Sequence, residues 1–499
     1  MSGTMTGLLE NAGRRFGAAP ALTMLGGQTF SFEALAGEAA RLAGHLRSQS
    51  IGRGDRVVLY LPNGREWIVA YHAIARLGAV VVPANFLLTA DEVAFILSDA
   101  EAKALIAAPA ETAAIVAAAS QAPDVVVEVV QGDDAAWSQL LAADPFSPVT
   151  VDPDDLFTLG FTSGTTGRPK GAMLSHANVF ASVALTATIH VRTRSEKVLT
   201  ALPFPHVYGN VVMNCAFVAG MHLLVMPRFE PAAALRAIGE LRPSIFEGVP
   251  TMYYQMLAHP DAATIDFSSL TRCTVGGQTM PAASIAAVVE LFGCPLCELW
   301  GMTELAGPAT SMSPYWPPRH GTIGLPFPGV EARVVDMDDP SKVVADGEAG
   351  ELRVRGSLVT KGYWRNPQAT AEAIDAEGWF ATGDVAVRED DGYLRIVDRR
   401  KDLIITGGYN IYPAELEQVI AAHPAVSMVA VAPVVDEEKG ELAKAFVVLR
   451  TGEACSEAEL LEHCRLSLAR YKVPRLIAFV DDLPKTSTGK IMRRALRTG

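Results

Sequence analysis

The stretch Phe161-Thr-Ser-Gly-Thr-Thr-Gly-Arg-Pro-Lys-Gly171 decides how the rest of this sequence is interpreted. It follows an apolar run at 156–160 that predicts a buried strand. Glycines let backbone N–H groups turn toward one point, and consecutive N–H groups of this kind form an anion-binding concavity. Hydroxyls add donors, and Lys170 adds a mobile positive charge. The composition suits a polyphosphate. A solvated surface loop is the alternative, because no Gly-Lys-Ser/Thr closes the stretch as in a Walker loop.

Length and charge limit the class of protein. At 499 residues the chain exceeds a single ordinary core, so we expect several units of core or one large and one small domain. Hydrophobic residues make up 49% and charged residues 19%, which is a globular composition. The net charge of −13 argues against a general affinity for nucleic acid or an anionic membrane. An anionic substrate must therefore meet a local cationic site.

Cysteine usage and apolar stretches indicate a cytoplasmic protein. Six cysteines do not suggest a disulfide framework, and we expect Cys294 and Cys297 to be buried thiols. The N-terminus lacks the charged-then-apolar pattern of a secretory signal. The longest apolar stretch, 211–226, is short for a membrane span and contains Asn214 and His222. It predicts a buried helix that leads into a strand.

The order of strand and helix patterns predicts an α/β fold. Helical spacing covers 5–48, with a strand-like piece near 28–31. Strands at 55–62, 79–83 and 104–107 then alternate with helices at 66–76 and 91–97, and further strands follow at 197–202, 223–226, 242–250 and 273–276. This alternation is typical of parallel, helix-covered sheets. Alternating strands at 330–335 and 350–356 predict an antiparallel or barrel-like section.

A charged cluster followed by two glycines, at 396–412, marks a second landmark. About one hundred residues follow it with patterns of their own: helices at 414–422 and 457–469, and strands at 428–431 and 444–449. That length is enough for a small independent domain. We therefore expect a domain boundary at 398–401.

Five further motifs combine residue types that a nucleotide site requires. Pro203-Phe-Pro-His-Val-Tyr-Gly209 is a rigid turn presenting a histidine, and Gly276-Gly-Gln-Thr-Met-Pro281 permits close backbone approach. Glu298-Leu-Trp-Gly-Met-Thr-Glu304 offers an aromatic to stack on a purine and a carboxylate for Mg²⁺. Trp379-Phe-Ala-Thr-Gly-Asp384 ends on a carboxylate that can accept ribose hydroxyls, and Pro484-Lys-Thr-Ser-Thr-Gly-Lys490 ends on a cation. Each motif alone also fits an ordinary turn, or for the last a basic disordered tail.

Together and in this order, the motifs resemble those of the adenylate-forming enzymes, which include acyl-CoA synthetases, adenylation domains of peptide synthetases and beetle luciferases. The resemblance covers roughly residues 10–497. It implies a large N-terminal domain, 1–400, of helix-covered sheets plus a distorted β-barrel. It also implies a small mobile α+β C-terminal domain, 401–499, that rotates about a hinge at Lys401.

The resemblance assigns roles to individual residues. Four are implied to be catalytic, with Glu304 also holding Mg²⁺: Lys490, His206, Thr303 and Glu304. ATP or AMP is implied to contact Thr162, Ser163, Gly164, Thr165, Thr166, Gly167, Lys170, Gly277, Gln278, Trp300, Gly301, Met302, Thr303, Asp384 and Arg399. The pocket for the acid is expected at His206, Tyr208, Val249, Gly276 and Leu299, and the channel for coenzyme A at Gly407 and Gly408. The aromatic at the first of the adenine positions is usually Tyr, and Trp300 keeps the stacking face.

The implied reaction is an ATP-dependent ligation of a carboxylic acid to coenzyme A through an acyl-adenylate. Malonate-type ligases often have an arginine where this chain has Leu299, and an unpaired second carboxylate would be costly to bury, so we expect a fatty or aromatic monocarboxylic acid. The alternatives are an acyl-AMP ligase that passes the acyl group to a carrier protein, and a non-enzymatic nucleotide-binding relative. An amino-acid substrate is disfavoured because the 203–209 motif lacks an Asp. A homodimer is the candidate assembly.

Overall fold

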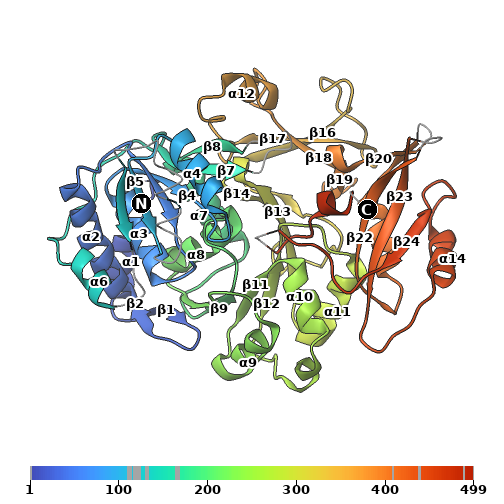
Figure 1. Ribbon diagram of the computed structural model, residues 1–499, viewed down its shortest axis with the longest axis horizontal. Coiled ribbons are helices and arrows are strands. Elements are labelled where there is room, and N and C mark those ends of the chain that lie inside the picture. The colour runs from blue at the N-terminus through green and yellow to red at the C-terminus, as the bar shows by residue number, and fades with distance from the viewer. Residues whose placement is uncertain are drawn as a thin grey trace.

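The protein is seen in a computed structural model, which describes residues 3–108, 115, 125–129, 134–162, 169–406, 409–436, 440–486 and 489–497. Most of the chain forms a large body of sheets and helices (Figure 1). The last hundred residues, orange to red in Figure 1, form a smaller body at one side.

The first sheet has six strands: β3 (Arg56–Tyr60), β4 (Val80–Pro83), β5 (Ala104–Ala107), β6 (Val126–Val129), β7 (Leu156–Thr162) and β8 (Lys170–Ser175). Their order is β6-β5-β3-β4-β7-β8, parallel except for β8, which returns antiparallel to β7. The intervening helices are α3 (Arg65–Arg76), α4 (Ala90–Asp99) and α6 (Asp134–Leu140). The predicted strand–helix alternation is confirmed here. The glycine-rich stretch connects β7 to β8, whose pairing runs up to Thr162 and Lys170.

The second sheet has nine strands in the order β15-β14-β13-β12-β11-β9-β10-β1-β2. They are β1 (Pro20–Met24), β2 (Thr29–Ser31), β9 (Lys197–Thr200), β10 (His222–Val225), β11 (Ile245–Gly248), β12 (Arg272–Val275), β13 (Leu296–Met302), β14 (Gly307–Ser311) and β15 (Leu325–Pro326). The central strands run parallel, so the carboxyl ends of β9, β12 and β13 lie at one edge. That edge carries three of the predicted motifs.

Helices cover these sheets: α1 (Leu8–Phe16), α2 (Phe32–Ser48), α7 (His176–Ile189), α8 (Val207–Ala219), α9 (Pro231–Leu241), α10 (Pro250–Leu257) and α11 (Ala282–Phe292). One hydrophobic core includes side chains from both sheets, for example Val57, Leu59, Val198 and Leu223. The helix and strand predicted within 211–226 are confirmed as α8 and β10. The expected thiols Cys294 and Cys297 are free and buried.

An antiparallel sheet follows, as predicted, with strands β16 (Val330–Val335), β17 (Ala349–Gly356), β18 (Phe380–Arg388) and β19 (Leu394–Arg399), and with helix α12 (Pro367–Ala373). A short 3-10 turn, Arg400–Asp402, leads out of β19. It precedes the last sheet, formed by β20 (Ile404–Thr406), β21 (Tyr409–Ile411), β22 (Val426–Asp436), β23 (Gly440–Leu449) and β24 (Leu476–Phe479).

The smaller body has a core of its own. Helices α13 (Pro413–Ala421) and α14 (Glu457–Ser467) contribute to it, and all of its buried members follow residue 403: Ile404, Ile411, Leu416, Ile420, Val426, Val429, Val431, Ala443, Ala445, Val447, Leu460, Cys464, Leu468 and Val473. A body with a separate core can move as a unit. Among the described residues, no helix is long and apolar enough to cross a membrane.

Two expectations need correction. The sequence predicts helical spacing over 5–48, but this range contains strand β1, which pairs in parallel with β10 about two hundred residues later. Local periodicity contains no information on such a partner. The strand predicted at 428–431 is part of the longer β22, because pairing with β23 continues from Val426 to Asp436.

Candidate active site

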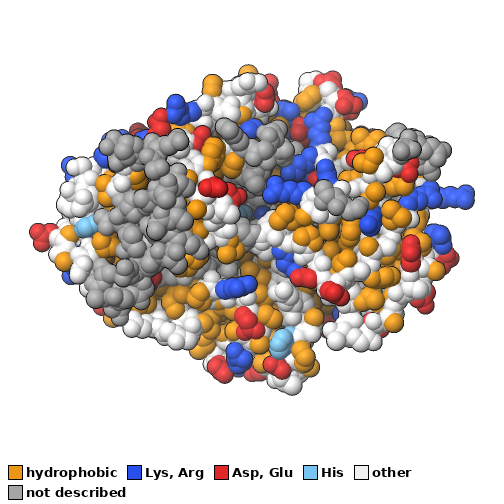
Figure 2. All heavy atoms as spheres, viewed as in Figure 1, with side chains coloured by type: hydrophobic (Ala, Val, Ile, Leu, Met, Phe, Trp, Pro, Cys, Tyr) orange, Lys and Arg blue, Asp and Glu red, His pale blue; other side chains and the backbone are white. Residues whose placement is uncertain are grey.

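The predicted motifs converge where the second sheet, the antiparallel sheet and the smaller body meet. Lys and Arg side chains gather along this boundary on the face seen in Figure 2. The residues of the glycine-rich stretch expected to bind the nucleotide, Ser163, Gly164, Thr165, Thr166 and Gly167, lie outside the described residues. So do the channel glycines Gly407 and Gly408.

Lys490 reaches from the smaller body into this site. A Cβ built on Gly277 would lie 2.9 Å from its Cε, so the lysine stem crosses directly over that glycine. Gly277 has φ +89°, a conformation that favours glycine in any case. Burial and the nearby charge of Arg399 lower the pKa of Lys490 to about 8, against a smaller opposing effect of Asp384. The structure thus brings together four of the residues that the sequence predicted as one site.

Trp300 and Arg399 hold a buried carboxylate between them. The indole Nε1 of Trp300 donates to Asp384 Oδ2 at 2.8 Å, and Arg399 Nε lies 3.2 Å from Asp384 Oδ1. Burial raises the pKa of Asp384, and the Arg399 guanidinium opposes that shift. The predicted stacking aromatic and the predicted ribose carboxylate are therefore adjacent. Both carboxylate oxygens are engaged, so ribose hydroxyls would share them.

Glu304 is the predicted metal ligand, and its surroundings fit the ion. It is 7% exposed, its Oε1 accepts a hydrogen bond from the Tyr363 hydroxyl at 3.0 Å, and burial raises its pKa. A cation beside it would offset the desolvation that now favours the neutral acid. Mg²⁺ is usually held by one or two carboxylates plus substrate phosphates. Among the described residues, no group of three or more His, Cys, Asp and Glu side chains is arranged to hold a metal.

The neighbours of Glu304 also face the glycine-rich connection. A Cβ on Gly160, in β7, would lie 2.7 Å from the Thr303 methyl, so the 298–304 motif packs directly on the strand that leads into the stretch. Lys170 Nζ lies 5.3 Å from the centre of the Tyr363 ring. Thr303, Glu304 and Lys170 thus share one region through Tyr363 and β7, as a polyphosphate site would require.

His206 caps helix α8 and is electrically neutral. Its Nδ1 accepts a hydrogen bond from the Tyr208 backbone N–H at 3.3 Å, so Nε2 carries the proton. Burial and the positive charge of Lys490 lower the pKa of His206 to about 3. A neutral imidazole with a free Nε2–H can donate to an oxygen of a bound acid, but it has too low a pKa for an efficient general base near neutral pH. The geometry agrees with a pocket wall.

Tyr208 uses its hydroxyl inside the protein. The hydroxyl lies 2.6 Å from Thr274 Oγ1, and Thr274 in turn donates to Glu247 Oε2 at 2.8 Å. Because the Thr274 proton is committed to the carboxylate, Tyr208 is the donor in the first bond. Glu247 also forms a fully buried ion pair with Arg192. Tyr208 can therefore offer its ring, rather than its hydroxyl, to an acid.

Three of the residues expected to line the acid pocket, Gly276, Leu299 and Val249, lie beside Gly277. A Cβ on Gly276 would lie 2.3 Å from Leu299 Cδ1, so the leucine side chain fills the space beside that glycine. Val249 is 3% exposed, and its Cγ1 would lie 3.5 Å from a Cβ on Gly277. Gly277 thus has Lys490 and Val249 as neighbours, and the adjacent Gly276 packs on Leu299.

The remaining predicted residues lie nearby. Met302 ends strand β13, and Gly301 faces the Gly307 carbonyl across the bulge between β13 and β14. Lys401 lies in the 3-10 turn between the two bodies, and burial together with Arg399 lowers its pKa. Gln278 lies beside Gly277, but its side-chain amide is bonded to the backbone of Ile491.

Two further residues contact the site although the sequence did not single them out. They are Tyr363 on Glu304 and Thr251 on the Gly489 carbonyl. A third residue, Glu298, lies in strand β13 before Trp300 and accepts from the Gly321 N–H. Burial raises the pKa of Glu298 to about 8, and only a backbone N–H, that of Gly321, offsets this. A charged residue inside an apolar strand was the available signal for Glu298. Tyr363 and Thr251 have no such signal, because their partners are distant in the sequence.

Comparison with known proteins agrees with this geometry. The family description "AMP-binding enzyme" matches residues 9–364, and "AMP-binding enzyme C-terminal domain" matches residues 415–490. A long-chain-fatty-acid–CoA ligase of Bacillus subtilis (strain 168) is 34% identical, over 99% of this chain and 94% of that protein. A feruloyl-CoA synthase of Amycolatopsis sp is 37% identical, over 95% of this chain and 94% of that protein. The ATP-bound structure of MatB from Rhodopseudomonas palustris is similar, with a TM-score of 0.93, 32% identity and coverage of 100% and 98% of the two chains.

Gly301 supplies a test of the packing behind the site. A Cβ there would lie 1.9 Å from the Gly307 backbone oxygen, so Gly301→Ala must push β13 and β14 apart. We expect a loss of about 1–3 kcal/mol in the free energy of unfolding, measured by urea denaturation, together with weaker ATP binding. Gly239→Ala in helix α9 is the control, because its nearest neighbours are 3.8 Å away and stability should rise slightly. Equal stability of the two variants would contradict the expectation.

Proposed function

This chain belongs to the AMP-binding enzyme family, and we propose that within it the protein is an ATP-dependent, AMP-forming acid–coenzyme A ligase. The observation that carries the proposal is the position of Lys490. Lys490 lies over Gly277. It is close enough to Asp384 for that carboxylate to act on its pKa, and close enough to His206 to lower the pKa of the imidazole. One cation thus stands between the groups proposed to bind nucleotide and the wall proposed to bind the acid.

In the first step, an acid carboxylate attacks the α-phosphorus of ATP, and pyrophosphate leaves. Negative charge spreads over the phosphoryl oxygens, so the protein contributes mainly orientation and electrostatic stabilisation. Lys490 stabilises the α-phosphate and carboxylate oxygens, His206 Nε2–H donates to the acid, and Trp300 and Asp384 hold the nucleoside. Mg²⁺, when held by Glu304 and the phosphates, supplies further charge neutralisation.

In the second step, the thiol of coenzyme A attacks the acyl carbon, and AMP leaves. The thiol needs a path to the acyl group, and Lys490 now fills the site. Rotation of 401–499 about Lys401 would withdraw the lysine. The separate core of the smaller body and the short 3-10 turn at 400–402 support this assignment. Gly407 and Gly408 remain our candidates for the channel.

The acid is proposed to be a fatty or aromatic monocarboxylate. Leu299, Gly276 and Val249 offer apolar surface, and burial of a second carboxylate against it would be costly. Arg192, which belongs to the hydrogen-bond network behind Tyr208, is already paired with Glu247 and so is not free to pair with a second carboxylate of the acid. The relatives named above, a fatty-acid ligase and a feruloyl-CoA synthase, support both acid classes equally.

A panel of acids tests the function. We expect ATP-dependent pyrophosphate release with fatty or aromatic monocarboxylic acids, and AMP and thioester formation when coenzyme A is added. Dicarboxylic acids serve as the comparison and should react at least tenfold more slowly. Pyrophosphate release with retained adenylate and no thioester would point to a carrier protein as acceptor. No release with any acid would favour a nucleotide-binding relative without activity.

Lys490→Ala should separate the two half-reactions. Removal of the cation should slow adenylate formation by about 10²–10³-fold, in the range found for single transition-state donors. Thioester formation from supplied acyl-AMP should be retained. Lys485→Ala is the control, since Lys485 lies in the same segment but pairs with Asp482. Equal loss of both half-reactions in Lys490→Ala would refute the rotation about Lys401.

The pKa of Lys490 predicts a pH dependence. The ammonium form is the active one, and it predominates below a pKa of about 8 in the ligand-free enzyme. For adenylate formation, kcat/KM for ATP should therefore fall as pH rises through about 8, because this parameter reports the free enzyme. Thioester formation from acyl-AMP should lack this decline, and so should the residual activity of Lys490→Ala. A decline retained in that variant would contradict the assignment.

A further inference from the structure

The segment that carries Lys490 is a hairpin held by its own backbone. Met492 N–H donates to the Pro484 carbonyl at 2.7 Å, and Thr486 N–H donates to the Lys490 carbonyl at 2.7 Å. The Thr486 hydroxyl accepts from Lys490 N–H at 3.1 Å. These bonds shape the hairpin but do not direct it toward the large body. Contacts made by the large body must do that.

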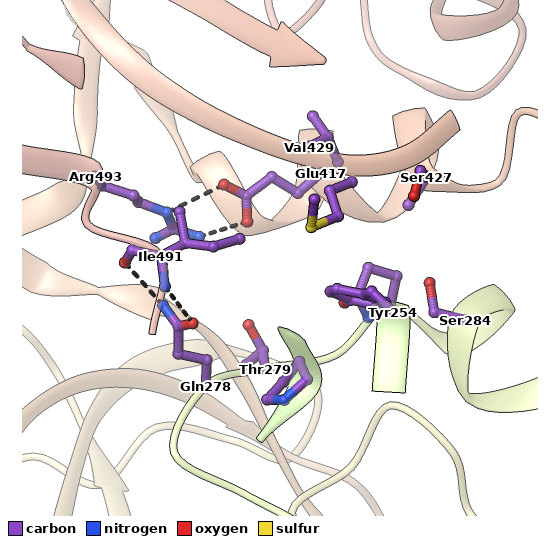
Figure 3. Close-up of a pocket in the computed structure, with 13 residues that line it drawn as sticks. Tyr254, Gln278, Thr279, Ser284, Glu417, Ser427, Val429, Ile491 and Arg493 are labelled. Atoms are coloured by element: carbon purple, nitrogen blue, oxygen red, sulfur yellow. Dashed lines mark hydrogen bonds and ion pairs between the residues drawn. The ribbon is translucent and has the colours of Figure 1, made fainter. Parts of the chain in front are cut away.

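Two side chains of the large body bind the backbone on either side of Lys490. Before it, the Thr251 hydroxyl donates to the Gly489 carbonyl at 2.8 Å. After it, Gln278 forms two bonds with Ile491: its Nε2 donates to the carbonyl at 3.0 Å, and its Oε1 accepts from the N–H at 2.8 Å. Figure 3 shows the two bonds between Gln278 and Ile491, at the crevice between the bodies.

We propose that Thr251 and Gln278 are positioning residues that hold Lys490 in the site for adenylate formation and release it for thioester formation. The proposal rests on the proposed function of Lys490 and adds the two residues that direct it. With both neighbouring peptides bound, the backbone at Lys490 has little freedom, and its side chain extends over Gly277. Lys490 itself needs no bond to the large body to be aimed correctly.

The three hydrogen bonds made by Thr251 and Gln278 are of a kind that can form and break in each catalytic cycle. All three bonds are between neutral groups and are only partly buried, so each is modest and water can replace it. The charged contacts of the segment lie within the smaller body or beside the hinge, at Asp398 in strand β19 of the large body. Arg493 binds Glu417 at 2.5 and 3.0 Å and Asp398 at 2.9 Å. A charged pair in place of Gln278 would resist the rotation.

The two residues should affect only the first half-reaction. Thr251→Val removes one hydroxyl at constant shape, and we expect adenylate formation at saturating ATP to slow by about 3- to 10-fold. Gln278→Ala removes two bonds and should slow it by about 10- to 100-fold. At saturating acyl-AMP, where a contact of Gln278 with the nucleotide would not limit the rate, thioester formation should stay at the wild-type rate or rise, since the hairpin leaves the site more readily. Thr251→Ser keeps the hydroxyl and should restore the first step.

Gln418→Ala is the matched control. Gln418 also bridges the two bodies through a single side-chain bond, in which its Oε1 accepts from Ala282 N–H at 3.0 Å. It does not flank Lys490, so both half-reactions should keep wild-type rates. The proposal is overturned if Gln418→Ala slows adenylate formation as much as Gln278→Ala. It is also overturned if Thr251→Val and Gln278→Ala slow both half-reactions equally, or neither.

Hydrogen exchange provides a readout that needs no activity. In the ligand-free protein, the Ile491 amide is bonded to Gln278, so a peptide containing 489–492 should exchange faster in Gln278→Ala than in wild type or Gln418→Ala. A wild-type protein that makes no adenylate from any acid would refute the proposed function, and exchange would still report the contact. Unchanged exchange in Gln278→Ala would refute the contact, even in an active enzyme.

Discussion

Desolvation of the Lys490 ammonium is the constraint on which the rest of the site depends. A buried cation is unfavourable without an anionic partner, and the Asp384 carboxylate beside it is already engaged by Trp300 and Arg399. The pKa of Lys490 is lowered because burial and Arg399 disfavour its positive charge more than Asp384 favours it. A polyphosphate and a carboxylic acid would supply the missing negative charge. The site is therefore electrostatically complete only with its proposed substrates bound.

The buried carboxyl groups are the complement of this cation. Burial raises the pKa values of Glu304, Asp384 and Glu298, and each group receives a hydrogen bond from a neighbouring donor: a tyrosine hydroxyl, an indole and a backbone N–H respectively. Each donor limits the cost of keeping a carboxylate away from water. In our proposal Mg²⁺ and the nucleoside take over that task. Glu304 is thus kept as a hard oxygen donor that forms no ion pair with a Lys or Arg among the described residues, whereas Asp384 is shared with Arg399.

The wall that we propose for the acid is built on a different principle. Its surface is apolar at Leu299, Gly276 and Val249, while behind it Tyr208, Thr274 and Glu247 form a chain of hydrogen bonds that ends at Arg192. Because these polar groups bond to one another behind the wall, the wall offers no charge to the acid. This arrangement favours recognition by shape and apolar contact.

The order of motifs, the alternation of strands and helices, and the identity of the groups around Lys490 were available from the sequence, because glycine-rich turns, apolar periodicity and charged residues at strand ends are local properties. Strand β1 was not, since its parallel partner β10 is distant along the chain. The same holds for Tyr363 on Glu304, and for Thr251 and Gln278 on the backbone around Lys490. A backbone carbonyl can accept from, and a backbone N–H can donate to, any suitably placed polar side chain, so the residue type alone does not predict such a partner. The sequence by itself determined which chemical groups this protein has for its reaction. Only the tertiary structure decided which side chains position them, because that depends on contacts between residues that are 59 to 238 positions apart.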